Sequence, residues 1–258
     1  MQTKDERPHV LAWQDPAAAL GLLSRLPVRV DLEAAQARGA RAAWAYPLAG
    51  IGVALIACLV GQGALWAGLP AGIVAGLVIA TLVIITGAMH EDGLADSADG
   101  LWGGWEKDRR LEIMKDSRIG AYGVLALVLS LGLRWVALAA VTEAGALWPV
   151  VIGTAALSRA AMVGVMHALP NARTDGLSRS VGRPPRAAAL VASGIGGAVW
   201  LLLSASGGPL FAAIIAAAAC GLIAKAKIGG QTGDTLGATQ QITEIVVLLA
   251  VVAQLSAP

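Results

Sequence analysis

The stretch that decides the fold runs from residue 42 to residue 90 and reads AAWAYPLAGIGVALIACLVGQGALWAGLPAGIVAGLVIATLVIITGAMH. Its 49 residues include no Asp, Glu, Lys or Arg. About 20 apolar residues suffice to cross a bilayer as a helix, so this stretch predicts two transmembrane spans. The turn-forming residues Gly68-Leu69-Pro70 mark the break between them.

The composition extends this prediction to the whole chain. Of the 258 residues, 57% are hydrophobic and 14% are charged, against roughly 25% charged residues in soluble domains. With 32 Gly and one Phe, the apolar residues are the small and aliphatic ones of closely packed membrane helices. An ordinary soluble enzyme is excluded, and no linker divides residues 1–258 into two domains.

Further apolar stretches bring the predicted number of spans to seven in an all-α, polytopic membrane bundle. Residues 187–224 contain no charge and hold two spans around the turn at Ser206-Gly207-Gly208-Pro209. The remaining three spans are predicted over residues 120–141, 147–169 and 241–256.

The positions of the charges predict the orientation. Of the 19 Lys and Arg residues, all but Arg134 and Arg159 fall in residues 1–43, 90–118, 170–186 and 225–237. Pairing the spans as hairpins puts these segments on one side, which the positive-inside rule makes cytoplasmic, together with the N-terminus. The net charge of +2 gives no reason to expect a nucleic acid partner.

The N-terminal segment, residues 1–43, is expected to be cytoplasmic or interfacial. Within it, residues 17–30 predict an amphipathic helix at the membrane interface, with a plain leader as the alternative. The first ten residues do not have the pattern of a cleaved signal peptide.

An acidic motif region, residues 90–118, follows the first two spans. It begins His90-Glu91-Asp92-Gly93-Leu94-Ala95-Asp96-Ser97-Ala98-Asp99-Gly100. On a helix, Asp92, Asp96 and Asp99 share a narrow stripe, while Glu91 points elsewhere. Grouped carboxylates suit Mg²⁺, Mn²⁺ or Ca²⁺ and the chemistry of a diphosphate. The alternative is a solvated acidic loop that forms ion pairs with Lys107, Arg109 and Arg110.

Lys115-Asp116-Ser117-Arg118 ends this region. Asp116 is a candidate for a further metal ligand or the general base, and Arg118 for a bidentate phosphate contact. The alternative for these residues is interfacial charge that reaches toward water.

A Gly-rich loop is predicted at residues 225–239. Its backbone N–H groups, beside Lys225 and Lys227, suit a phosphate or a nucleotide, although a plain connector has a similar composition. Arg159 and Glu244 are charges within apolar spans and are expected to face a polar site. Cys58 and Cys220 lie in apolar runs and are expected to pack in the interior.

Three blocks resemble the cobalamin synthase family (adenosylcobinamide-GDP ribazoletransferase). They are His90-x-Asp-Gly-Leu-Ala-Asp-x-x-Asp-Gly100, Glu112-Ile-Met-Lys-Asp-Ser-Arg-Ile-Gly120 and Gly229-Gly-Gln-Thr-Gly-Asp-Thr-Leu-Gly-Ala238. Shorter matches are Ser24-Arg-Leu-Pro-Val28, Ser158-Arg159, Ala172-Arg173, Gly176-Leu177 and Glu244. The resemblance covers nearly the whole chain.

The resemblance implies an enzyme of the prokaryotic cytoplasmic membrane that joins adenosylcobinamide-GDP to α-ribazole or its 5′-phosphate and releases GMP, with Mg²⁺ or alternatively Mn²⁺. Expected partners besides the lipid bilayer are other late corrinoid-pathway enzymes and a second copy of the chain. We expect Asp92, Asp96, Asp99 and Asp116 as metal ligands, and His90, Asp99 and Asp116 as catalytic residues. The expected substrate-binding residues are Lys115, Ser117, Arg118, Arg159, Lys225, Gln231, Thr232, Asp234, Thr235 and Glu244.

Two alternatives stay open. Asp96-x-x-Asp99-Gly100 is similar to the opening of the CDP-alcohol phosphotransferase motif, but Gly103-Gly104 stands where that motif has Ala-Arg, and its later Asp pair is reduced to Asp116. A secondary transporter would require acids near the bilayer midplane and paired half-repeats. Because Glu91 occupies a variable position of its block, Glu91→Leu is predicted to be tolerated.

Overall fold

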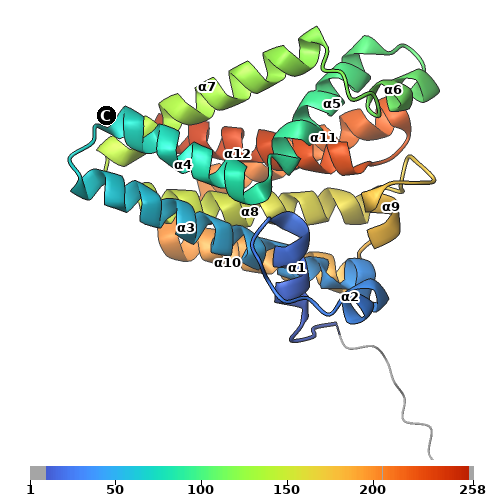
Figure 1. The fold of residues 1–258 in the computed structure, drawn as a ribbon, viewed down its shortest axis with the longest axis horizontal. Helices are drawn as coiled ribbons and strands as arrows, with labels where there is room; N and C mark the ends of the chain where they lie inside the picture. Colours follow the sequence, from blue (N-terminus) through green and yellow to red (C-terminus); the bar gives the residue numbers. More distant parts are fainter. Residues whose placement is uncertain (1–9, 205, 256–258) are drawn as a thin grey trace, which may run out of the picture.

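The computed structural model describes residues 10–204 and 206–255, and every regular element within them is a helix. Among these described residues, six helices are long and apolar enough to cross a membrane, and a bent pair of helices makes up to seven. This confirms the predicted membrane bundle (Figure 1). The six are α3 (Tyr46–Trp66), α7 (Ala121–Glu143), α8 (Leu147–Ala168), α10 (Arg186–Ser204), α11 (Gly207–Ile228) and α12 (Gly233–Leu255).

Helix α8 is the centre of the bundle, and small residues let its neighbours approach it. A side chain at Gly50 of α3 would meet the carbonyl oxygen of Ala155 at 2.6 Å, and one at Gly196 of α10 would meet the Cβ of Ala160 at 2.7 Å. Close backbone contact of this kind holds membrane helices together, because lipid provides no hydrophobic driving force between them.

A sharp bend separates α4 (Ala71–Thr86) from α5 (Met89–Gly103). The two helix axes differ by 87°. Gly87 (φ 63°) and Ala88 (φ 56°) both adopt the left-handed conformation, which is unfavourable for a residue with a Cβ. As a result α5 runs across the bundle (Figure 1), where it packs against α7 and α12.

The N-terminal segment differs from the predicted amphipathic helix over residues 17–30. Helix α1 covers only Asp15–Leu23, and Ala19 and Leu23 are buried against the bundle. The chain then runs extended, and the backbone N–H of Arg25 donates to the carbonyl of Ile85 at 2.6 Å. Because Ile85 lies just before the bend, this bond ties the segment to the α4–α5 junction. The expectation about a signal peptide concerned residues 1–10, and residues 1–9 lie outside the described residues.

The short helices gather at one end of the bundle (Figure 1). They are α2 (Leu32–Arg38), which continues into the 3-10 helix η1 (Gly39–Ala45), α6 (Lys107–Ile113) and α9 (Leu177–Val181). The α3–α4 and α7–α8 turns lie at the other end.

The predicted loop over residues 225–239 is shorter than expected, because α11 continues to Ile228 and α12 already begins at Gly233.

Candidate active site

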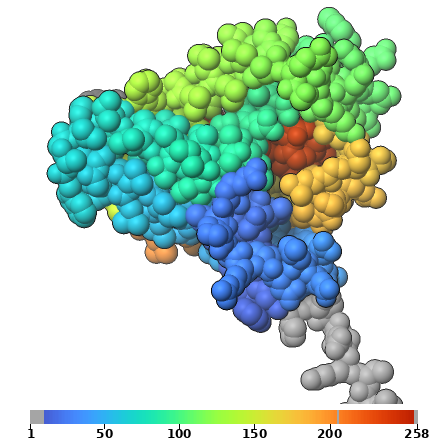
Figure 2. Space-filling model, in the orientation of Figure 1, coloured from blue at the N-terminus to red at the C-terminus, as the bar shows by residue number. Residues whose placement is uncertain are grey.

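A pocket of about 170 Å³ opens at the end of the bundle where the short helices gather. It is lined by Met89 and Asp92 of α5, by residues 231–234 at the start of α12, and by the segment from Asn171 to Arg179. Figure 2 shows the surface of α12 at the bottom of a hollow, bordered by the green, yellow-orange and blue parts of the chain. Three stretches far apart in the sequence therefore form one site.

The crossing of α5 and α12 is close because glycines meet there. A Cβ at Gly93 would lie 2.8 Å from the carbonyl oxygen of Asp234, and one at Gly237 would lie 3.4 Å from the Cα of Gly93. Any side chain at Gly93 would push the helices apart. The two glycines thus bring the acidic residues of α5 next to Asp234.

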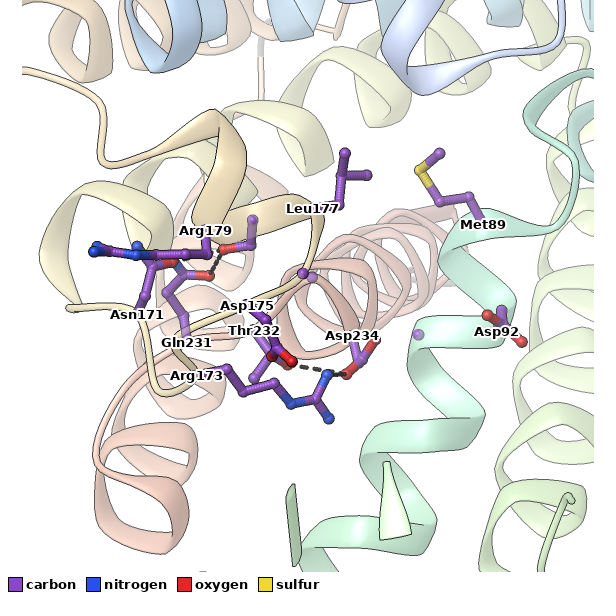
Figure 3. A pocket seen from close by; sticks show the side chains of 14 residues that line it. Met89, Asp92, Asn171, Arg173, Asp175, Leu177, Arg179, Gln231, Thr232 and Asp234 are labelled. Atoms are coloured by element: carbon purple, nitrogen blue, oxygen red, sulfur yellow. Dashed lines mark hydrogen bonds and ion pairs between the residues drawn. The ribbon is translucent and has the colours of Figure 1, made fainter. Parts of the chain in front are cut away.

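Carboxylates of α5 and α12 share this end of the pocket with Arg173. Arg173 pairs with Asp234 (Nη1 to Oδ2, 3.0 Å), and the hydroxyl of Thr232 donates to the same oxygen at 3.2 Å. Figure 3 shows Arg173 reaching Asp234, with Asp92 on the neighbouring helix α5. Asp96, predicted as a metal ligand, lies one helical turn after Asp92 on α5 and is not among the residues that line the pocket.

The segment from Asn171 to Arg179 is anchored to the loop before α12. The hydroxyl of Ser178 lies 2.8 Å from Asn171 Oδ1 and 2.6 Å from Gln231 Oε1, and the amide of Gln231 donates to Asn171 at 2.6 Å. The backbones also pair, since Ala172 N–H donates to the carbonyl of Gln231. Gln231 therefore shapes the pocket wall by holding this segment in place.

Asp99, predicted as a metal ligand and catalytic residue, has a different environment. Its two carboxylate oxygens accept the backbone N–H groups of Gly120 (2.7 Å) and Gly123 (2.9 Å). These groups belong to the start of α7, whose first N–H groups have no partner within the helix. Each oxygen of Asp99 therefore accepts one N–H group, which gives Asp99 a structural contact with α7, and its role as a metal ligand and catalytic residue stays a prediction.

Asp116, Lys115, Ser117 and Arg118 do not line the pocket. Asp116 forms an exposed ion pair with Arg118 at 2.9 Å, and hydrogen bonds from Arg118 hold the pKa of Asp116 below its usual value. Lys115 pairs with Asp175 at 2.6 Å and lowers the pKa of that carboxyl in the same way. Asp175 lines the pocket, so Lys115 is linked to it only indirectly. This segment follows α6 and forms surface ion pairs outside the pocket lining, and the role of Asp116 as a metal ligand or general base stays a prediction.

Arg159 and Glu244, predicted as substrate-binding residues, belong to a cluster buried inside the spans. Arg134 of α7 lies 2.9 Å from Glu91 and 2.8 Å from Glu244, and Arg159 lies 3.7 Å from Glu244. All four side chains are at most 9% exposed. We call Glu91, Arg134, Arg159 and Glu244 the ion cluster. It contradicts the expectation that Glu91 is dispensable, because Glu91 is a partner of a buried guanidinium.

Other predicted residues lie beside the pocket rather than in its wall. His90 is buried where α5 crosses α12, with its Cα 3.3 Å from the position a Cβ would take at Gly237. The hydroxyl of Thr235 accepts the N–H of Thr232 at 2.9 Å, which shapes the loop before α12. Lys225 borders a separate apolar groove between α8 and α11. Of the predicted substrate-binding residues, Gln231, Thr232 and Asp234 line the pocket.

Sequence reasoning gave no role to Asn171, Asp175, Ser178 and Arg179, and it used Arg173 only as part of a family match. All five line the pocket. The sequence feature that could have indicated these pocket residues is the basic segment 170–186, in which Arg173 and Asp175 interrupt the pattern of apolar spans.

Comparison with known proteins assigns the family. The model of the cobalamin-5-phosphate synthase family matches residues 15–252. An adenosylcobinamide-GDP ribazoletransferase of Bradyrhizobium diazoefficiens is 46% identical over 246 residues, covering 93% of each chain. Proteins of the same name from Mesorhizobium japonicum (43%, 94% of each chain) and Rhizobium meliloti (46%, 92% of this chain and 95% of the relative) agree. No solved structure matches the chain. The chain belongs to the cobalamin-5-phosphate synthase family.

Proposed function

We propose that the protein is an adenosylcobinamide-GDP ribazoletransferase of cobalamin biosynthesis. It would join adenosylcobinamide-GDP to α-ribazole or α-ribazole 5′-phosphate and release GMP, as the names of its relatives imply. The observation that carries the proposal is the pocket in which Asp92, Asp234 and Arg173 meet. It combines acids that suit a divalent cation with a guanidinium that suits a phosphate.

The transfer is a displacement at phosphorus. A hydroxyl oxygen of the acceptor ribose bonds to the phosphorus that carries the cobinamide, and the bond from this phosphorus to the oxygen of GMP breaks. GMP leaves with the electron pair, and a pocket carboxylate takes up the hydroxyl proton. Catalysis of such a step rests on positioning and charge stabilisation. Arg173 would bind a phosphate oxygen, since it lines the pocket beside Asp92 and Asp234 and carries a guanidinium.

Mg²⁺, or alternatively Mn²⁺, fits the donors present if the substrate supplies further ligands. Within the part of the chain that the structure describes, no three His, Cys, Asp or Glu side chains are arranged to hold a metal ion. Mg²⁺ is commonly bound by one or two carboxylates together with substrate phosphates and water. Asp92 and Asp96, one helical turn apart, would be those carboxylates. The ion would neutralise charge on the diphosphate.

The pocket end is proposed to face the cytoplasm of the bacterial inner membrane. The basic segments that include α2, α6 and α9 lie at this end (Figure 1), and positive charge favours the cytoplasmic side. Nucleotide substrates would then reach the pocket from the compartment in which they are made.

The test is GMP release by the purified protein in liposomes, with adenosylcobinamide-GDP, each form of α-ribazole, and Mg²⁺. Release should require both substrates and should fall at least 100-fold in Asp92→Asn, while Glu112→Gln, at the exposed ion pair with Arg109 outside the pocket, stays active. Release of CMP from a CDP-activated lipid in a parallel reaction would instead indicate a lipid synthase. Movement of solute without GMP release would indicate a transporter.

A further inference from the structure

The ion cluster lies next to the proposed site without lining it. Glu91 directly precedes Asp92, which lines the pocket, and Glu244 lies ten residues after Asp234 on the same helix. The cluster joins α5, α7, α8 and α12 inside the apolar spans, where charged groups are costly unless paired. Its two guanidiniums and two carboxylates balance in charge.

We propose that Glu91 and Arg134 are positioning residues for the phosphate transfer. They fix the rotation of α5 about its axis, and so the direction in which Asp92 and Asp96 point. The inference rests on the proposed function, because it assigns these two aspartates to the reaction.

The bend before α5 uncouples the rotation of α5 from that of α4. Left-handed residues at Gly87 and Ala88 turn the chain by 87°, so α5 does not inherit its rotation from a continuous helix. Its first turn is fixed by contacts instead. Successive residues of a helix are 100° apart, so a rotation that released Glu91 from Arg134 would turn Asp92 by the same angle.

Directional hydrogen bonds hold Glu91 at the start of α5. Its Oε1 accepts from Arg134 Nη1 at 2.9 Å and from the amide of Gln241 at 3.1 Å. Gln241 in turn accepts from Arg134 at 3.0 Å. The start of α5 is therefore bound at one point to α7 and to α12, the helix that contributes Asp234. The contact between Gly93 and Gly237 brings α5 and α12 together, and Glu91 adds directional hydrogen bonds directly beside Asp92.

Positioning by the Glu91–Arg134 ion pair is separable from the effect of this pair on stability. A buried ion pair often contributes no more stability than an apolar pair of similar volume, whereas removing one partner leaves an unpaired charge. Replacing Glu91 and Arg134 together by Leu should therefore restore stability without restoring directional bonds. Arg159 and Glu244 would remain as a neutral pair.

The experiment compares Glu91→Leu, Arg134→Leu and the double variant in liposomes, measuring unfolding temperature and kcat for GMP release. Both single variants should unfold at lower temperature. The double variant should regain the wild-type unfolding temperature within a few degrees, while its kcat stays at least tenfold lower. Arg109→Gln with Glu112→Gln removes an exposed ion pair of α6 and is the matched control, expected to keep full activity.

A second variant covers the case in which the double variant does not fold. Glu91→Gln retains an oxygen that accepts from Arg134, so its kcat should stay within about threefold of wild type, whereas Glu91→Leu loses at least tenfold. The inference is overturned if the double variant regains both stability and turnover, or if Glu91→Leu retains turnover. A wild-type protein that releases no GMP would contradict the proposed function instead.

Discussion

At the scale of single residues, two aspartates of the same helix have different environments. Asp92 lines the pocket, whereas Asp99 binds two backbone N–H groups at the start of α7. Hydrogen bonds to a charged group contribute about 1.5 to 3 kcal/mol each. Asp99→Ala should therefore lower the free energy of unfolding by about 2 kcal/mol or more, measured by denaturant unfolding in detergent.

The matched comparison is Asp99→Asn, which keeps one acceptor oxygen. Its GMP release should stay within about threefold of wild type, unlike that of Asp92→Asn. A stable Asp99→Asn protein without turnover would instead support the predicted role of Asp99 as a metal ligand or catalytic residue.

Sequence reasoning identified the acidic stripe but not the environment of each carboxylate. Periodicity placed Asp92, Asp96 and Asp99 on one face of a helix, and α5 is a helix there. Which neighbour each one meets depends on α7 and α12, which are distant in the sequence. The pairing of Glu91 with Arg134 could not be predicted for the same reason, since the two are 43 residues apart.

At the scale of helices, the contact between α5 and α12 depends on the absence of side chains. Gly93→Ala places a Cβ 2.8 Å from a carbonyl oxygen of α12, so the helices must separate. Turnover should fall at least tenfold, although alanine favours a helix over glycine by about 1 kcal/mol. The control is Gly132→Ala on α7, where a Cβ meets no atom within 4 Å. Equal turnover in both variants, measured as GMP release, would contradict a role for this contact.

The spans themselves were predictable from apolar stretches, because a helix in lipid must satisfy its own backbone hydrogen bonds. The predicted stretch 120–141 corresponds to α7 and 147–169 to α8. The bend at Gly87 and Ala88 was not predicted, because it lies inside the uncharged stretch and has no proline. The start of α12 was predicted eight residues too late. The Gly and Thr residues before 241 are typical of a loop, and the sequence does not show that they pack against α5.

At the scale of the whole molecule, the bundle has two dissimilar ends. Short helices, basic segments and the pocket lie at one end, and tight turns at the other (Figure 1). The sequence positions of the Lys and Arg residues predicted this distribution. The pocket wall from Asn171 to Arg179 could not be predicted in this way, because it depends on side-chain hydrogen bonds to Gln231.

The bend after α4 has a consequence for the surrounding lipid. Helix α4 has 16 residues and is about 24 Å long, shorter than a hydrocarbon core of roughly 30 Å. This hydrophobic mismatch favours local thinning of the bilayer beside α4, which would let water and headgroups approach the α5 carboxylates. GMP release should therefore fall as the acyl chains of the liposomes lengthen, when lipids of one headgroup are compared. A rate independent of bilayer thickness would show that the protein does not thin the membrane at its site.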